Sequence, residues 1–323
     1  KTPTSMKHNL LLFAFMIISC SVFAQDDIKC DTCWKRSLFS ALNFNQASFT
    51  NWSAGGDNSI GLLAVTNAFY NYKAIDSSRT WENSLDLAYG IIQNGNNPLR
   101  KNEDRIEFIS KYGHRAFYKV YYAGLLNFRS QFAPGFNFPN DSVVVSRFLA
   151  PAWLLVSLGL DWKPNDVFNL YLSPATGRLT IVRDQELADQ GAYGVDPAIY
   201  NEVTDSVGNV SIVKVTDGKM FRPEFGAMMS MKFQKDVVKN VNLKTRLDLF
   251  NNYTDKNKPN RKNIDVTWET AITLKVNKYI SSTLLTTLLY DNDIPFIDRE
   301  GNVFGPRLQF KQLFGLGFSV KLQ

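Results

Sequence analysis

Alternation of apolar and polar residues with a period of two most constrains what this chain can fold into. In residues 154–162, aliphatic or aromatic side chains stand at every even position, and Ser157, Gly159 and Asp161 stand between them. Successive side chains of a β-strand point to opposite faces, so such a segment has one apolar and one polar face. Twelve strands are predicted, at residues 38–44, 62–73, 81–89, 106–112, 122–129, 154–162, 168–173, 225–233, 243–249, 266–275, 280–290 and 310–322.

The connections between these segments alternate in length. The long ones run over residues 45–58, 92–103, 132–148, 182–220, 252–263 and 291–308, and the short ones over 74–79, 113–116, 163–167, 235–240 and 277–279. Long external loops and short periplasmic turns are typical of bacterial outer-membrane barrels. The sequence therefore predicts an all-β fold, a single antiparallel transmembrane β-barrel of about 12 strands, with both termini periplasmic and long extracellular loops. A secreted two-layer β-sandwich stays the alternative, but it gives no reason for the alternating loop lengths.

The membrane sets requirements that these segments meet. Hydrocarbon forbids open sheet edges, and a spanning strand needs about 9–11 residues. Aromatic residues near the ends of the apolar faces fit interfacial girdles; they are Trp81, Tyr89, Trp162, Tyr253, Trp268 and Tyr290. The apolar share of 45% and the aromatic share of 13% exclude a disordered chain. Without an apolar run of about 18 residues, a helical membrane protein is also excluded.

The N-terminus predicts export. Met6-Lys7-His8 is basic, residues 10–18 are apolar, and Val22-Phe23-Ala24 fits a signal-peptidase site before Gln25. We therefore expect upstream residues plus a signal peptide over 1–24, a periplasmic N-terminal tail over 25–35 and an outer-membrane β-barrel over 36–323. In the alternative, Ile17-Ile18-Ser19-Cys20 is a lipoprotein box and Cys20 is lipidated. Both predict the bacterial cell outer membrane as the location.

Cys30 and Cys33, as Cys-Asp-Thr-Cys, are the cysteines left after cleavage. An oxidising compartment makes them a disulfide candidate, with free thiols as the alternative. The same spacing can lower a thiol pKa and serve redox chemistry. No strand–helix context of a thioredoxin fold accompanies it, so the local structural interpretation is favoured.

Charged residues on the polar faces are the most informative group. Because they alternate with apolar residues, they are expected to face the lumen. There they must pair or contact water, because a buried unpaired charge is costly. The lumen-facing candidates are Glu82, Asp86, Arg105, Glu107, Lys111, Arg129, Asp161, Glu224, Lys232, Lys244, Arg246, Asp248, Asp265, Glu269 and Lys275. With both signs mixed, a plugged or narrow lumen is favoured over an open polar channel.

Two long connections contain turn signals of their own. Residues 203–215 predict a hairpin around Gly208-Asn209, and residues 294–304 predict another around Glu300-Gly301. Such loops could bind a partner or be plain surface hairpins.

Catalytic chemistry is scarce. A serine–histidine esterase needs a nucleophile, a base and an orienting group close together. His114, the only histidine beyond residue 24, falls in a predicted turn, Gly113 to Ala116, so such an esterase is disfavoured. Asp291-Asn292-Asp293 with Asp298 lacks the glycine of a calcium loop. Cleavage after Ala24 removes Lys1 and Lys7 from a net charge of +6, and the remaining +4 is too small and dispersed to favour nucleic acid. We expect no enzyme, no catalytic residue, no metal and no cofactor.

Several stretches carry a family resemblance. They are 44–56 (FNQASFTNWSAGG), 85–90 (LDLAYG), 131–135 (QFAPG), 172–182 (LSPATGRLTIV), 247–250 (LDLF) and 305–311 (GPRLQFK). The chain resembles a family of outer-membrane β-barrels of Bacteroidota that is known only as a domain of unknown function. This resemblance implies an outer-membrane location and brings no catalytic residues. The ending Val320-Lys321-Leu322-Gln323 departs from the terminal aromatic residue common in barrels.

Two functions are therefore expected to compete. The first is a structural or accessory barrel of a larger cell-envelope complex, with a plugged or narrow lumen. The alternative is a narrow channel for small polar solutes, and a secreted β-sandwich binding protein is a distant third. The expected partners are outer-membrane lipid, the barrel assembly machinery during biogenesis and envelope proteins that contact the extracellular loops.

Overall fold

The computed structural model describes residues 34–48, 58–137, 142–204, 210–277, 280–292, 296–297 and 303–322. They belong to one compact unit, Trp34–Gln323. The predicted signal peptide, the alternative lipidation site at Cys20 and the Cys30–Cys33 pair lie outside the described residues and stay predictions. The first strand begins at Trp34, slightly before the expected boundary at residue 36.

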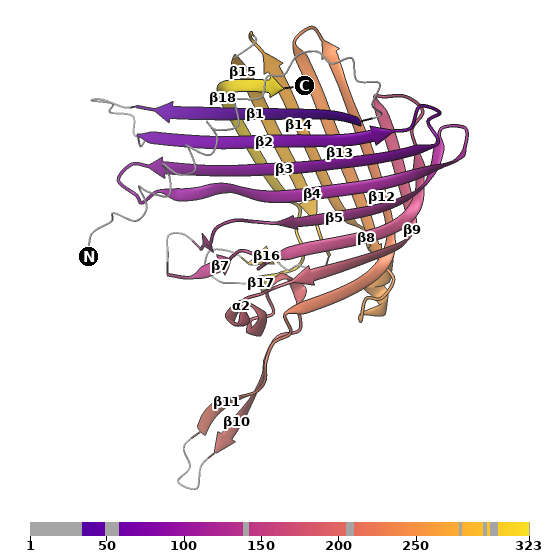
Figure 1. The fold of residues 1–323 in the computed structure, drawn as a ribbon. Coiled ribbons are helices and arrows are strands. Elements are labelled where there is room, and N and C mark those ends of the chain that lie inside the picture. The colour runs from indigo at the N-terminus through magenta and orange to yellow at the C-terminus, as the bar shows by residue number, and fades with distance from the viewer. Residues whose placement is uncertain are drawn as a thin grey trace. The chain divides into compact units, whose positions relative to one another are not determined.

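Twelve strands close into one barrel. In chain order they are β1 (Trp34–Ala47), β2 (Ser59–Lys73), β3 (Arg79–Asn94), β4 (Arg100–Phe117), β5 (Val120–Ser130), β8 (Ala152–Trp162), β9 (Phe168–Ile181), β12 (Phe221–Val238), β13 (Val241–Asn252), β14 (Asp265–Lys275), β15 (Ile280–Tyr290) and β18 (Gln309–Leu322). Each is antiparallel to its neighbours around the wall (Figure 1). Strand β1 pairs with both β2 and β18, so the last strand closes the sheet onto the first.

The predicted all-β fold, a single closed antiparallel barrel of 12 strands, is confirmed, and the sandwich alternative is wrong. The periplasmic termini and the extracellular loops stay predictions. Each of the twelve predicted segments lies within one barrel strand. Three predicted connections are wrong because β3, β4 and β12 extend further than the alternation showed. The turn expected over 235–240 shrinks to residues 239–240, because β12 runs to Val238 and β13 begins at Val241. The connection expected over 92–103 shrinks to residues 95–99. The turn expected over 113–116 lies inside β4, where His114 pairs with Arg79 and Tyr122.

The outward face of the barrel is apolar and exposed. Leu158 is 66% and Phe314 is 59% exposed, which a folded protein in water would not repeat strand after strand. Similar side chains continue around the wall, namely Leu42, Phe44, Leu62, Phe108, Leu126, Val156, Leu172, Phe225, Trp268, Phe310 and Leu316. A closed sheet with such a surface is a transmembrane β-barrel. No helix among the described residues is long and apolar enough to cross a bilayer.

A β-bulge in β9 resets which residues face inward. Gly226 of β12 pairs with Thr176, but Met228 pairs with Ser173, so β9 carries one extra residue at Pro174–Ala175. The buried positions change from odd numbers, such as Tyr171, to even numbers, such as Thr176. A bulge tolerates proline because the ladder is interrupted there. The strand continues through the bulge to Ile181, beyond the predicted segment 168–173.

Two long connections pack together into a structure that we call the loop cap, made of residues 131–151 and 182–204 with 210–220. It contains β6 (Gly135–Phe136), β7 (Val144–Ser146), α2 (Gln185–Asp189) and η2 (Ala192–Gly194). Its apolar core joins both connections and consists of Ala150, Val182, Leu187, Ala188 and Val195. The Asp184 side chain accepts a hydrogen bond from the Leu187 N–H and so caps α2.

Three further elements lie in the connections. Strands β10 (Ile199–Thr204) and β11 (Val210–Thr216) pair antiparallel, which confirms the predicted hairpin around residues 208–209. Strands β16 (Phe296–Ile297) and β17 (Val303–Phe304) pair likewise and confirm the second one. A short 3-10 helix, η3 (Lys258–Lys262), follows β13.

The bulge also explains why a glycine stands opposite it. A Cβ on Gly159 would lie 2.1 Å from the backbone oxygen of Leu172, and that backbone cannot move without breaking the β8–β9 ladder. We predict that Gly159→Ala lowers the free energy of unfolding by about 1–3 kcal/mol, the usual effect of overpacking. Gly177→Ala is the matched control, because the nearest heavy atom to its Cβ is 3.9 Å away. Urea unfolding in lipid vesicles measures both; equal stabilities would contradict the prediction.

Candidate functional site

Ion pairs that join strands far apart on the wall fill the barrel interior. Strands β4 and β14 have five strands between them in either direction around the barrel. Nevertheless, Arg105 Nη1 of β4 lies 3.5 Å from Glu269 Oε1 of β14. A contact between strands at opposite sides of a closed barrel has to cross the lumen. The interior is therefore spanned by charged side chains.

The central network is the set of charged residues around Arg246, namely Arg105, Glu107, Arg129, Arg246, Asp248 and Glu269. Arg246 Nη2 lies 2.8 Å from Glu107 Oε1 and 2.7 Å from Glu269 Oε2. Its Nε lies 3.2 Å from Asp248 Oδ2. Two of the three guanidinium nitrogens of Arg246 thus lie within ion-pair distance of three carboxylates.

Each carboxylate of the central network has a further hydrogen-bond or ion-pair partner besides Arg246. Arg129 Nη2 lies 3.1 Å from Glu269 Oε1. Asn127 Nδ2 donates to Glu107 Oε1 at 3.2 Å, and Ser230 Oγ bonds Asp248 Oδ1 at 2.6 Å. Glu107 is only 1% exposed, so its charge depends on these partners rather than on water.

A second group, the turn-end cluster, lies near the connection between β8 and β9. Lys111 Nζ lies 2.8 Å from Asp161 Oδ2 and 3.4 Å from Glu82 Oε2. Lys163 also pairs with Glu82 and Asp161. Asn169 donates to Asp161 and accepts from Lys111. Asp161 is fully buried, and this cluster surrounds it with donors.

A third group joins β9 to β12 and β14. Arg178 donates to Glu224 through Nε and Nη2, both at 2.8 Å, and its Nη1 lies 2.9 Å from Asp265 Oδ2. Arg222 Nη2 lies 2.8 Å from Glu224 Oε1. The guanidinium of Arg178 also stacks 4.2 Å from the ring centre of Phe250, which fixes its plane.

Four predicted lumen residues lie outside these groups. Asp86 accepts a hydrogen bond from Asn67, and Lys244 Nζ lies 5.5 Å from the ring centre of Phe69. Lys275 is exposed near the end of β14. Among the described residues, the Lys232 side chain has no ion pair or hydrogen bond, and it lies near the cations Lys111 and Arg246 as well as near Asp248 and Glu82.

Five charged residues of these ion pairs were missed. Arg178 follows the bulge at Pro174, where the inward parity changes. Glu103 was assigned to a loop, but it lies on β4 and pairs with Lys311 of β18 at 2.7 Å. Lys163 was placed in a turn. For Arg222 and Lys311, alternation within the extended strands β12 and β18 was the available signal.

Apolar side chains occupy the inward face of β4, β5 and β9 beside these charges. Ile109, Ala123, Leu125 and Tyr171 form one buried cluster. The Tyr171 hydroxyl bonds Ser157 Oγ at 2.9 Å, which satisfies both buried hydroxyls. This part of the interior is therefore packed like a core rather than filled with water.

No group of three or more histidine, cysteine or acidic residues within the described part of the chain is arranged to hold a metal ion. In the loop cap, hydrogen bonds from Lys214, Gln185 and the Gly218 N–H lower the pKa of Asp189 to about 2. That carboxylate thus ties the base of the β10–β11 hairpin to α2.

Comparisons with known proteins follow this geometry. The sequence model of a family described as "Protein of unknown function (DUF3078)" matches residues 44–136. This supports the resemblance to a domain of unknown function over less than half of the chain. No curated protein matches the chain.

Solved structures give distant similarities. The translocator domain of autotransporter NalP from Neisseria meningitidis is 10% identical with a TM-score of 0.36, covering 99% of this chain and 97% of that chain. The COG4313 outer membrane channel from Pseudomonas putida F1 is 9% identical with a TM-score of 0.39, covering 91% and 97% respectively. The β domain of the Bordetella autotransporter BrkA is 10% identical with a TM-score of 0.30, covering 89% and 99%.

Removing the cation at the centre of the network takes from Glu107 and Asp248 their only ion-pair partner among the described residues, and from Glu269 one of its three. We predict that Arg246→Met lowers the free energy of unfolding by about 3–5 kcal/mol, the usual effect of breaking a buried ion pair from one side. Urea unfolding followed by tryptophan fluorescence measures it. Lys219→Met is the control, because Lys219 pairs with Asp196 at the surface and an exposed pair contributes about 0–1 kcal/mol. A loss no larger than in the control would show that the central network is solvated.

Proposed function

We propose that this protein is an outer-membrane β-barrel with a closed lumen that serves as a structural or accessory barrel of a larger cell-envelope complex. The observation that carries the proposal is the central network, which bridges β4 and β5 to β13 and β14 through the barrel interior. A pore must leave a continuous aqueous path, whereas here paired charges and a packed apolar cluster occupy the interior. The resemblance in the sequence further favours an origin in Bacteroidota, and we propose no catalytic activity.

The surface outside the wall supports a role in assembly. Every residue of β11 is exposed, including Ile212 at 72% and Val210 at 61%. On β10, Ile199, Tyr200 and Val203 are each about half exposed. A two-stranded ribbon alone is marginally stable in water. An apolar ribbon anchored to a folded loop cap is the kind of element that gains stability when a protein partner covers it.

A narrow channel for small polar solutes is the second candidate, favoured by one observation. Lys232 has no ion-pair partner among the described residues, and Lys244 contacts an aromatic ring rather than a carboxylate. Unneutralised cations in a lumen attract anions, so a channel of this kind would prefer small anionic solutes.

Conductance distinguishes the two candidates. We predict that the purified barrel in a planar bilayer gives no unitary current steps. The triple variant Glu107→Ala, Arg246→Ala, Glu269→Ala should give steps, because it removes the side chains that cross the lumen. The double variant Asp196→Ala, Lys219→Ala is the control, because it removes an exposed ion pair of the loop cap. Regular steps from the unmodified protein would contradict the closed lumen and favour the channel.

Isolation from native membranes tests the accessory role. We predict that the barrel, extracted in mild detergent, copurifies with the same envelope protein in each preparation. A variant in which a short glycine linker replaces residues 199–216 should lose that protein, because it lacks the apolar hairpin. The linker can be short, since Ile199 pairs with Thr216 and the two chain ends are neighbours. The Gly177→Ala barrel is the control. A protein that migrates alone, in amounts independent of the hairpin, would contradict this role.

A further inference from the structure

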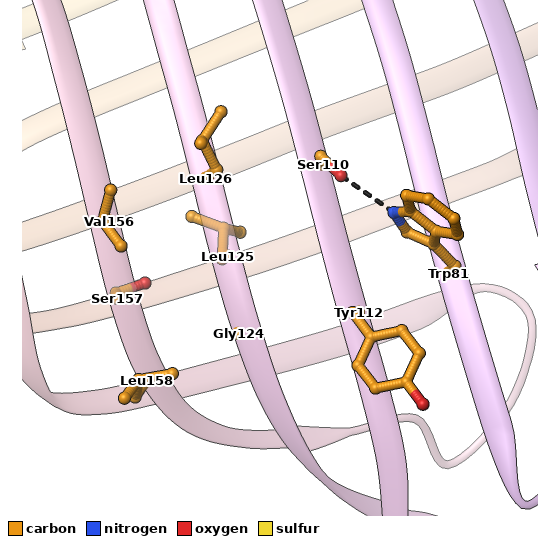
Figure 2. A pocket seen from close by; sticks show the side chains of 9 residues that line it. All are labelled: Trp81, Ser110, Tyr112, Gly124, Leu125, Leu126, Val156, Ser157 and Leu158. Carbon is orange, nitrogen blue, oxygen red and sulfur yellow. Dashed lines mark hydrogen bonds between the residues drawn. The ribbon is translucent and has the colours of Figure 1, made fainter.

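The outer wall contains a hollow over four neighbouring strands. Its volume is about 430 Å³, and β3, β4, β5 and β8 all contribute to it (Figure 2). The outward side chains at its rim include Trp81, Tyr112, Leu126, Val156 and Leu158. Neighbouring parts of the same wall carry exposed apolar side chains such as Leu160 and Leu172, so the hollow opens onto the lipid-facing surface.

A missing side chain produces the hollow. Gly124 of β5 lies between Tyr112 on one side and Leu158 on the other, and Figure 2 shows no side chain there. A Cβ added to Gly124 would meet one atom within 4 Å, Leu158 Cδ2 at 3.5 Å, which is an ordinary contact. The strand geometry therefore does not require a glycine at this position. On the inward side Leu125 packs against the buried apolar cluster, so the wall behind the hollow is firm.

Three polar side chains beside the hollow, those of Trp81, Ser110 and Asn83, donate hydrogen bonds to protein acceptors. Trp81 Nε1 donates to Ser110 Oγ at 2.9 Å, and Ser110 Oγ donates to Asn83 Oδ1 at 2.8 Å (Figure 2 shows the first of these bonds). Asn83 Nδ2 donates in turn to the Tyr70 carbonyl oxygen at 2.9 Å. These bonds pair the donors of Trp81, Ser110 and Asn83 with protein acceptors, as polar groups in hydrocarbon require. What the hollow presents to an occupant is therefore apolar surface.

We propose that the hollow binds one acyl chain of a membrane glycerophospholipid, an inference that rests on the proposed outer-membrane location. The hollow is continuous with the lipid-facing wall, where Val156 is 50% and Leu158 is 66% exposed. Water would lack the two to four polar partners that it needs there, and an empty gap loses dispersion contacts. Trp81 and Tyr112 are aromatic residues of the kind found at the lipid interface. The bound segment is thus the part of the chain near the ester groups.

Filling the gap tests the proposal. Gly124→Leu places a side chain in the hollow. Gly177→Leu is the control on β9, because Gly177 has similarly open space and does not line the hollow, although it pairs with Val156 at the hollow's edge. After purification through lipid-free detergent, native mass spectrometry counts the phospholipids that each barrel retains. We expect one tightly held phospholipid on the unmodified and Gly177→Leu proteins. Retention by Gly124→Leu should be lower by about tenfold, the effect of losing contact with about two methylene groups. Equal retention by all three would overturn the proposal.

A second measurement keeps the test independent of the folding of Gly124→Leu. The barrel is loaded with phospholipid brominated on the acyl chain near the ester and then moved into bromine-free detergent. Comparison with Trp81→Phe isolates the fluorescence of Trp81 from that of the other tryptophans. Persistent quenching of Trp81 supports the site, and immediate recovery overturns it. Conductance tests the closed lumen separately from phospholipid retention. A barrel that conducts and still retains the phospholipid would contradict the proposed function and leave this inference intact.

Discussion

The requirement that backbone hydrogen bonds be satisfied inside hydrocarbon governs this structure. A sheet in a membrane cannot leave an edge, so the last strand has to pair with the first. In this protein that seam joins Leu42 to Phe318 and Ala41 to Ser319. Once the seam closes, every strand presents one face to lipid and one to the interior. The alternation in the sequence, the apolar wall and the charged lumen all follow from this closure.

The interior shows how charges can be kept away from bulk water. Taking carboxylates and guanidinium groups out of water carries a large penalty, which only close, multiply bonded partners offset. Glu107, Glu269 and Arg246 meet this condition across the barrel, with Arg129 and Asn127 in support. The same pairing that makes these charges tolerable also occupies the lumen. Stability of the barrel and closure of its interior are therefore one feature of the structure.

Local alternation predicted the strands well because it is a property of neighbouring residues. All twelve segments were found, and both hairpins around Gly208 and Gly301 were expected from their turn residues. The ends of strands were less predictable, since Gly113 resembled a turn residue although it lies in β4 close to Tyr121. The loop predicted over residues 92–103 was likewise too long, because β3 extends to Asn94 and β4 begins at Arg100.

The arrangement of the site was much less accessible from the sequence. Parity placed charges such as Glu107 and Arg246 on the polar face, but it could not show that they meet, because 139 positions separate them along the chain. Arg178 was missed because the bulge at Pro174 reverses parity within one strand. The hollow at Gly124 depends on side chains from four strands, and no single segment carries its signal.

Oxygen accessibility along β8 tests most directly whether the barrel wall faces hydrocarbon on one side and a packed interior on the other. In a cysteine-free background, single nitroxide labels at residues 155, 156, 157 and 158 of β8 report contact with oxygen dissolved in the bilayer. We expect high oxygen accessibility at Val156 and Leu158, which face lipid, and low accessibility at Leu155 and Ser157, which face the packed interior. Uniformly low oxygen accessibility at all four positions, with both even positions open to a water-soluble relaxing agent, would contradict this arrangement.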